Sequence, residues 1–209
     1  MSQSQRQRRL RLLVRRLNRQ RKQQARQVDI LCADLVAANR GFVRRLDGVS
    51  FAAGFYKSLL GAGNLRSLLK RAGQLIAKEL PGASVSFFLR QSEGCEFQAF
   101  DDRQASQIAE PRLEDGFGPE LIDSICKWNK PCTVDDLLGM GLEGSPRGLE
   151  QISIATLPLN DLGRALGFIL IYRPMPNRLR HEELRKIGLV TCGLSHAIRG
   201  CRTPVHLSR

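Results

Sequence analysis

The sequence predicts an α+β fold, in which an antiparallel β-sheet with packed helices follows a long basic N-terminal helix that forms a coiled coil. Three observations favour this class. An apolar heptad pattern runs through residues 10–49, and helical and strand patterns alternate after it. Two strongly apolar segments near the end of the chain are separated only by residues 160–164, which is typical of a β-hairpin.

Positive charge is concentrated in residues 1–28, here called the basic arm. The chain carries a net charge of +13, and the arm holds ten Arg or Lys residues and no Asp or Glu. Such a segment fits nucleic acid, an anionic membrane surface or an acidic protein as its partner, or it is a solvated terminus. The candidate anion-binding side chains are Arg8, Arg9, Arg11, Arg15, Arg16, Arg19, Arg21 and Lys22.

The heptad pattern in residues 10–49 predicts a helix that meets a partner helix. Alternating steps of four and three residues from Leu10 reach twelve positions, of which nine are apolar. A period of 3.5 residues keeps these side chains on one side only if the helix supercoils, so we expect a parallel homodimer. Arg21 and Gln24 interrupt the stripe and would set its register. The alternative is a helix that packs against its own globular domain.

Glycine, proline and helix-capping residues predict where the next helices and strands begin and end. Four glycines in and around residues 50–63 predict a joint between the heptad helix and a globular domain. Asn64 caps a helix over residues 64–80. Strands are expected at residues 84–90 and 95–100, joined as a hairpin and followed by an irregular segment to residue 115.

The second half of the domain, which we place at residues 64–199, is read in the same way. A helix is expected over residues 118–130, with Pro119 in its first turn, then a short strand and a polar, glycine-rich loop over residues 135–149. Strands at 152–159 and 165–172 flank the turn, and the second is apolar on both faces, so it should be central in the sheet. A helix over residues 181–199 closes the domain before a tail, residues 200–209.

Neither a membrane anchor nor a metal site is expected. The longest apolar run is too short for a bilayer and the N-terminus has Arg where a signal peptide needs an apolar centre, so we expect a cytoplasmic protein. The six cysteines form no CxxC pair, and the histidines are not at ligand spacing from them. We expect reduced thiols, most of them buried.

Four segments together resemble the GAF domain family over roughly residues 55–199. They are NLRSLLKRAGQLIAKELPGASVSFFL, GFGPELIDSICKWNKPCTVDDL, SIATLPLNDLGRALGFILIYRP and HEELRKIGLVTCGLSHAI. The resemblance implies a six-stranded antiparallel sheet with helices on one face. It also implies a ligand cavity on the other face, beneath variable loops, and flanking helices that form a parallel dimer.

The resemblance implies a candidate ligand site formed by the irregular segments and the helix between them. Its residues would be Phe100, Phe117, Ile122, Trp128, Asp136, Leu138 and Ser153. The alternative for Phe117, Ile122 and Trp128 is a place in the apolar core.

The ligands that GAF domains are known for are not matched here, and the sequence identifies no cofactor. The cyclic-nucleotide motif lacks its Lys, Phe and Asp near residues 177–183, and no cysteine has the neighbouring histidine of a bilin site. His181 and His196 fall in the closing helix rather than at a haem position. Residues 195–204 resemble a histidine-kinase phospho-acceptor box, which we interpret as coincidental.

We therefore expect a non-enzymatic regulatory protein. A GAF branch uses cysteines to reduce methionine sulfoxide, but Cys126 lies in the C-terminal half of its helix, where the dipole disfavours a thiolate. The favoured hypothesis is a sensory domain that binds a small ligand or a partner protein and dimerises through its N-terminal helix. The alternative is a scaffold or nucleic-acid-associated protein that acts through the basic arm, with no ligand in its domain.

Overall fold

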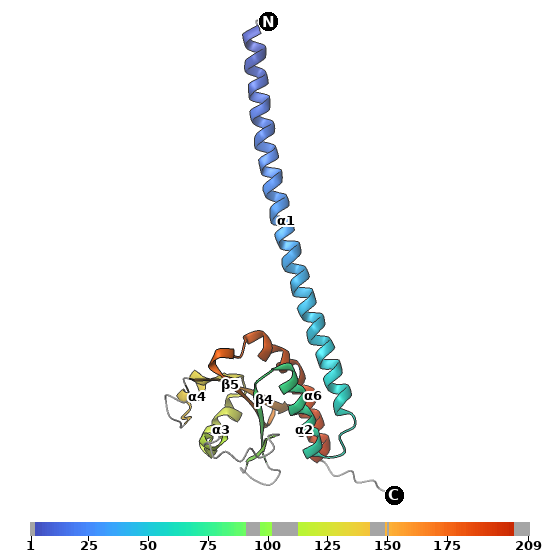
Figure 1. Cartoon of the computed structure of the whole chain (residues 1–209), viewed down its shortest axis with the longest axis vertical. Coiled ribbons are helices and arrows are strands. Elements are labelled where there is room, and N and C mark those ends of the chain that lie inside the picture. The colour runs from blue at the N-terminus through green and yellow to red at the C-terminus, as the bar shows by residue number, and fades with distance from the viewer. Residues whose placement is uncertain (1–2, 91–96, 102–112, 143–148, 150, 203–209) are drawn as a thin grey trace. The chain divides into compact units, whose positions relative to one another are not determined.

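The computed structural model describes residues 3–90, 97–101, 113–142, 149 and 151–202 (Figure 1). The chain divides into two compact units, Met1–Val49 and Ser50–Arg209, and each is described by itself below.

The first unit consists, within its described residues, of one helix. It is the N-terminal part of α1 (Gln3–Leu59), a segment rich in Arg, Gln and Leu that contains no proline. Because no second element of this unit covers the helix, its apolar side chains are exposed. Eight of the heptad residues are half exposed or more, namely Leu10, Val14, Leu17, Val28, Leu31, Leu35, Phe42 and Val49.

The helix continues through the segment where we expected a joint, residues 50–63, and ends at Leu59. Phe51, Phe55 and Leu59 are spaced four residues apart and therefore share one face. Phe55 and Leu59 are buried in the core of the second unit, with Phe51 packed against that core. This burial outweighs the cost of a helical glycine at Gly54, which is about 1 kcal/mol relative to alanine.

A short turn leads to α2 (Leu65–Glu79). Asn64 caps this helix as expected: its Oδ1 accepts a hydrogen bond from the backbone N–H of Ser67 at 2.8 Å. The Ser67 side chain returns toward the Asn64 backbone N–H, which completes a capping box. The buried face of α2 includes Leu68, Leu69 and Ile76, which pack on the sheet.

The sheet is antiparallel and has five strands in the described residues, whereas the resemblance implied six. Their order is β2-β1-β5-β4-β3. The strands are β1 (Ser84–Arg90), β2 (Phe97–Asp101), β3 (Cys132–Thr133), β4 (Ile152–Asp161) and β5 (Arg164–Pro174).

β5 occupies the centre of the sheet, as its two-sided apolar pattern predicted. Phe168 and Leu170 point to one face, Ile169 and Ile171 point to the other, and all four are fully buried. In Figure 1 the sheet lies between α2 and α6 (His181–Arg202) on one side and α3 (Pro119–Trp128) and α4 (Val134–Gly139) on the other. Helices therefore cover both faces, not only one.

The hairpin between β4 and β5 is confirmed, with a turn shorter than expected. Only Leu162 and Gly163 lie between the strands, and both have positive φ, 47° and 82°. Positive φ at both central residues is the signature of a type I′ turn, whose twist matches that of the strands. Gly163 adopts this conformation without the steric cost that a side chain adds.

The helices of the second half agree with the prediction except for one. α3 begins after Gly118 with Pro119 in its first turn and ends at Trp128, followed by the C-cap residue Asn129 in a left-handed conformation. α4 occupies part of residues 135–149, where we expected a loop, because Thr133 and Asp136 form a capping box at its start. α6 continues to Arg202, three residues beyond its predicted end.

Two short 3₁₀ helices, η1 (Leu113–Gly116) and η2 (Met175–Asn177), complete the described elements. Most of the irregular segment expected before residue 115 lies outside the described residues, as do residues 143–148 of the glycine-rich loop.

The five cysteines in the described residues are free, and most of them are not buried. Cys132 is buried and Cys126 half-buried, whereas Cys32, Cys192 and Cys201 are exposed, so the expectation of burial is wrong for these three. Cys95 lies outside the described residues. No group of three potential metal ligands occurs in the part of the chain that the structure describes. No described helix is both long and apolar enough to cross a membrane.

Candidate functional site

Three phenylalanine rings pack together on the sheet face that α3 covers. The rings of Phe88 and Phe168 stack with centroids 4.9 Å apart, and Phe117 packs against both, at 5.4 and 6.1 Å. All three side chains are buried, and Ile122 of α3 joins the same apolar cluster. Two of the predicted ligand-site residues, Phe117 and Ile122, therefore lie together in the core beneath α3.

A small polar group borders these rings. Glu114 of η1 accepts a hydrogen bond from the hydroxyl of Ser86 at 2.6 Å, and its carboxylate lies 3.1 Å from the hydroxyl of Tyr172. Ser86 is fully buried. A buried hydroxyl needs such a partner, since an unpaired one costs about 1–3 kcal/mol. The carboxylate thus fixes η1 against β1 and β5.

The other predicted ligand-site residues do not converge with Phe117 and Ile122. Trp128 and Leu138 are about half exposed, and the Lys130 ammonium lies 5.4 Å from the centre of the Trp128 ring. Asp136 caps α4 by accepting hydrogen bonds from the N–H and hydroxyl of Thr133, and these bonds lower the pKa of its carboxyl.

Two further predicted residues lie on strands. The Ser153 hydroxyl accepts a hydrogen bond from the backbone N–H of Leu179 at 3.1 Å, which ties the segment before α6 to β4. Phe100 lies in β2 and pairs with Phe87 of β1. The structure describes the backbone of Phe100 but not its side chain.

The basic arm presents its cations along α1. Every described arginine and lysine of the predicted set is exposed; they are Arg9, Arg11, Arg15, Arg16, Arg19, Arg21 and Lys22. Arg8 lies on the same helix, and its side chain is not described.

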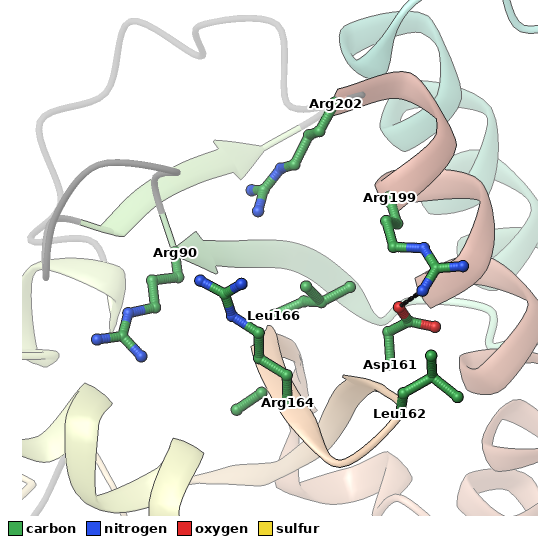
Figure 2. A pocket seen from close by; sticks show the side chains of 8 residues that line it. Arg90, Asp161, Leu162, Arg164, Leu166, Arg199 and Arg202 are labelled. Carbon is green, nitrogen blue, oxygen red and sulfur yellow. Dashed lines mark hydrogen bonds and ion pairs between the residues drawn. The ribbon is translucent and has the colours of Figure 1, made fainter. Parts of the chain in front are cut away.

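A pocket that the sequence did not reveal lies at one end of the sheet, and we name it the arginine pocket. It has a volume of about 440 Å³. Figure 2 shows its residues on the end of β1, the β4–β5 hairpin and the last turns of α6. The lining residues are Arg90, Asp161, Leu162, Arg164, Ala165, Leu166, Arg199 and Arg202.

Asp161 is already engaged by two side chains of α6. Its Oδ2 accepts a hydrogen bond from Arg199, drawn as a dashed line in Figure 2, and its Oδ1 lies 3.0 Å from His196 Nδ1. The Asp161 side chain is buried, with 5% of its surface exposed. A buried carboxylate is stabilised by a cation such as Arg199, so Asp161 fixes the C-terminal part of α6 on the hairpin.

The remaining charge of the pocket is positive. Arg164 and Arg202 extend into the same space from opposite sides in Figure 2, one from β5 and one from α6. Burial lowers the pKa of Arg202. Desolvation of a cation is unfavourable, so an incoming anion would stabilise this side chain. Sequence reasoning missed it because its arginines are up to 112 residues apart, Arg90 to Arg202.

The cysteines nearest the apolar face are poor nucleophiles. Burial, reinforced by the charge of Asp123, raises the pKa of the Cys126 thiol to about 11. Burial also raises the pKa of Cys132, whose Sγ donates to the carbonyl of Lys130. Since the thiolate is the reactive form of cysteine, neither side chain is prepared for thiol chemistry near neutral pH.

No protein-family model matches the sequence, and no curated protein matches it either. Solved structures do. The GAF domain of a phosphoenolpyruvate-protein phosphotransferase from Coxiella burnetii is 20% identical with a TM-score of 0.58, covering 75% of this chain and 95% of that one. The corresponding Acinetobacter domain is 10% identical with a TM-score of 0.55, covering 73% and 93%.

The chromophore-binding domain of a bacteriophytochrome from R. palustris is also similar. It is 14% identical, its TM-score is 0.53, and the match covers 75% of this chain and 62% of that one. At these identities the likeness speaks to the fold and not to the ligand. The chain has a GAF-like α+β fold.

Proposed function

We propose that this protein is a non-enzymatic regulatory module, in which the GAF-like domain binds a small ligand or a partner protein and the N-terminal helix forms a parallel homodimer. The observation that carries the proposal is the exposed apolar stripe of α1. Leu17, Leu31 and Leu35 are 62%, 67% and 71% exposed on a helix that has no other element in its own unit.

A second copy of the chain is the occupant that this stripe fits best. Its period of 3.5 residues is that of a left-handed coiled coil, and an identical helix in parallel register repeats the same positions at the same heights. A helix this long gains most of its stability from packing an apolar face rather than from intrinsic propensity. The basic side chains on its remaining surface stay in water.

Pairing of the two N-terminal helices would allow a ligand bound to the domain to change how these helices are arranged. A ligand changes the arrangement of a paired helix only if it binds two arrangements of the protein with different affinity. The end of α1 supports such coupling, because Phe55 and Leu59 are part of the domain core. The Tyr56 hydroxyl also donates to the carbonyl of Leu189 in α6.

The thiols support a non-enzymatic role. A cysteine-based reductase needs a thiolate and a resolving partner. The raised pKa values of Cys126 and Cys132 oppose the first requirement.

The proposal is tested by measuring the mass of the full chain in solution by light scattering at tens of micromolar protein. We expect twice the mass of one chain, and one chain mass for the variant Leu31→Asp/Leu35→Asp. The matched control is Ile30→Asp/Val36→Asp, which changes exposed apolar residues of the same helix outside the stripe and should leave the dimer intact. A monomeric wild type, or equal effects of the two variants, overturns the proposal.

The basic arm supports a second candidate function, association with nucleic acid or another anionic surface. Nine of its ten cations are exposed on one helix, and the side chain of the tenth, Arg8, is not described. They would add affinity by neutralising phosphates and releasing counterions. No aromatic residue lies among them, so the contact would be to the backbone of a nucleic acid and not to its bases.

A further inference from the structure

We propose that the arginine pocket binds a phosphomonoester, the phosphate held by Arg164 and Arg202 and the organic part resting on Leu162, Ala165 and Leu166. All lining residues of this site belong to the GAF-like domain, and none belongs to α1 or to the cluster of Phe88, Phe117 and Phe168. The inference does not depend on dimerisation.

The charge of the pocket selects an anion. Four arginines line it, and Asp161 is its one carboxylate among the described lining residues. Asp161 is already engaged by Arg199 and His196, so it is committed to holding α6. An anion placed between Arg164 and Arg202 would offset the charge of two guanidinium groups that converge from different elements.

The chemistry of arginine favours phosphate within the class of anions. Its planar guanidinium donates two parallel hydrogen bonds to phosphate oxygens and stays charged at every physiological pH. A phosphomonoester carries close to two negative charges near pH 7 and three acceptor oxygens, which suits more than one arginine at once. Burial of Arg202 strengthens such a contact, because charges attract more strongly away from water.

The size and the apolar wall favour an organic phosphate over the inorganic ion. A volume of about 440 Å³ falls in the range of small-molecule sites and exceeds what one phosphate group fills. Leu162, Ala165 and Leu166 supply an apolar surface beside the cations. This pairing of a few polar groups with apolar surface is typical of a metabolite site.

A concave pocket also distinguishes this site from the basic arm. The arm spreads its cations along an exposed helix, which suits an extended polyanion. In the arginine pocket the cations come from β1, β5 and α6 and face a confined space. A phosphate on a small molecule reaches such a space more readily than one in a duplex backbone.

The test measures binding to the full chain by calorimetry at low salt, with AMP and ribose 5-phosphate as phosphorylated probes, inorganic phosphate as the minimal probe, and adenosine and ribose as unphosphorylated controls. The variants are Arg164→Gln and Arg202→Gln. The control is Arg185→Gln, which removes an exposed arginine of α6 that does not line the pocket. The basic arm is present in every variant, so the differences report the pocket alone.

We expect inorganic phosphate to bind with Kd on the order of 1 mM and at least one phosphorylated probe to bind more tightly. Each pocket variant should weaken binding about tenfold, the effect of losing one charge-assisted contact, while Arg185→Gln leaves it unchanged. Absence of binding by all phosphorylated probes overturns the proposal. Equal binding of the phosphorylated probes by the wild type and both pocket variants also overturns it. The proposal fails as well if the pocket variants lose only their binding to duplex DNA or to anionic vesicles. None of these outcomes bears on the mass of the protein in solution, which tests the dimer separately.

Discussion

Gly167 of β5 lies directly against the backbone of Phe88 in β1. A Cβ atom at residue 167 would lie 1.9 Å from the carbonyl oxygen of Phe88, a distance that no real side chain adopts. Gly167 also has a φ of +147°, which L-residues with side chains rarely adopt. The register of the β4–β5 pair shifts beside this residue, since Leu159 of β4 pairs with Gly167 and Asn160 pairs with Ala165.

Gly167→Ala should therefore destabilise the domain by about 2–5 kcal/mol, since it adds backbone strain and a steric clash that neither strand can relieve. Urea unfolding followed by circular dichroism measures this change. Gly188→Ala is the control, because Gly188 lies in α6 with nothing within 4 Å of its Cβ position and should gain up to about 1 kcal/mol from helix propensity. A loss below about 1 kcal/mol for Gly167→Ala would contradict the packing described here.

The hairpin turn predicts a stabilising substitution. Leu162 has a φ of 47° although its side chain is 87% exposed and gains little from burial. Asn tolerates this conformation better, and Asn-Gly is the preferred pair for a type I′ turn. Leu162→Asn should raise the free energy of unfolding by about 0.5–1 kcal/mol.

Leu60→Asn provides the control for the hairpin substitution, because Leu60 is equally exposed, 87%, and does not have positive φ. It should change stability by less than about 0.5 kcal/mol. If both substitutions stabilise the domain equally, the effect reflects the removal of an exposed leucine and not the turn.

Cys126 predicts a stability change at alkaline pH. Its pKa rises from about 9 in the unfolded chain to about 11 in the folded domain, mainly through burial. The folded state therefore holds this proton more tightly, so the contribution to stability is complete below about pH 9 and is lost as the pH rises toward about 11. Cys126→Ala should show a shallower decline of unfolding free energy over this window.

The control for the alkaline measurement is Cys192→Ala, since Cys192 is exposed. Its decline should parallel that of the wild type. Alkylation gives a second readout: iodoacetamide should label Cys126 slowly at neutral pH and faster as the pH approaches about 11. Rapid labelling of Cys126 at neutral pH in the folded protein would contradict the raised pKa.

The sequence predicted the elements whose signals are local. Asn64 predicted the start of α2, and Pro119 predicted the start of α3. The apolar pattern of residues 165–172 predicted the central strand. The continuation of α1 to Leu59 was missed because Gly48 and Gly54 suggest a break, and only tertiary burial of Phe55 outweighs it. α4 was missed because its Thr133–Asp136 capping box lies beside a glycine-rich segment.

The site was harder to predict than the fold. Phe117 and Ile122 were predicted as ligand-site residues with burial in the core as the alternative, and that burial depends on Phe88 and Phe168, which lie on strands distant in the sequence. The arginine pocket joins the ends of elements that are far apart in sequence. No spacing rule connects Arg90 to Arg202, so only the antiparallel register and the position of α6 bring them together.

The basic arm predicts salt-dependent binding to generic duplex DNA. If its cations neutralise phosphates, the logarithm of the affinity should fall linearly with the logarithm of the salt concentration, and steeply between about 50 and about 200 mM. Fluorescence anisotropy measures this dependence. Replacement of the eight candidate arm residues, Arg8 to Lys22, by Gln should remove most of the binding and flatten the slope.

The control for the arm is Arg40→Gln/Arg45→Gln, which removes exposed charges farther along the same helix. This variant should retain nearly all of the affinity. Negligible binding of the wild-type chain at low salt would eliminate nucleic acid as the partner of the arm.

The central claim, a parallel dimer through α1, is tested most directly by disulfide formation between two copies of the chain. Leu35 lies on the heptad stripe, and Ala33 lies on the same turn of the helix but faces away from it. In a Cys32→Ser background, mild oxidation should join Leu35→Cys chains into a covalent dimer far faster than Ala33→Cys chains, because only residue 35 meets its own counterpart in a parallel pair. Equal rates for the two variants, or no covalent dimer from Leu35→Cys, would contradict the proposed pairing.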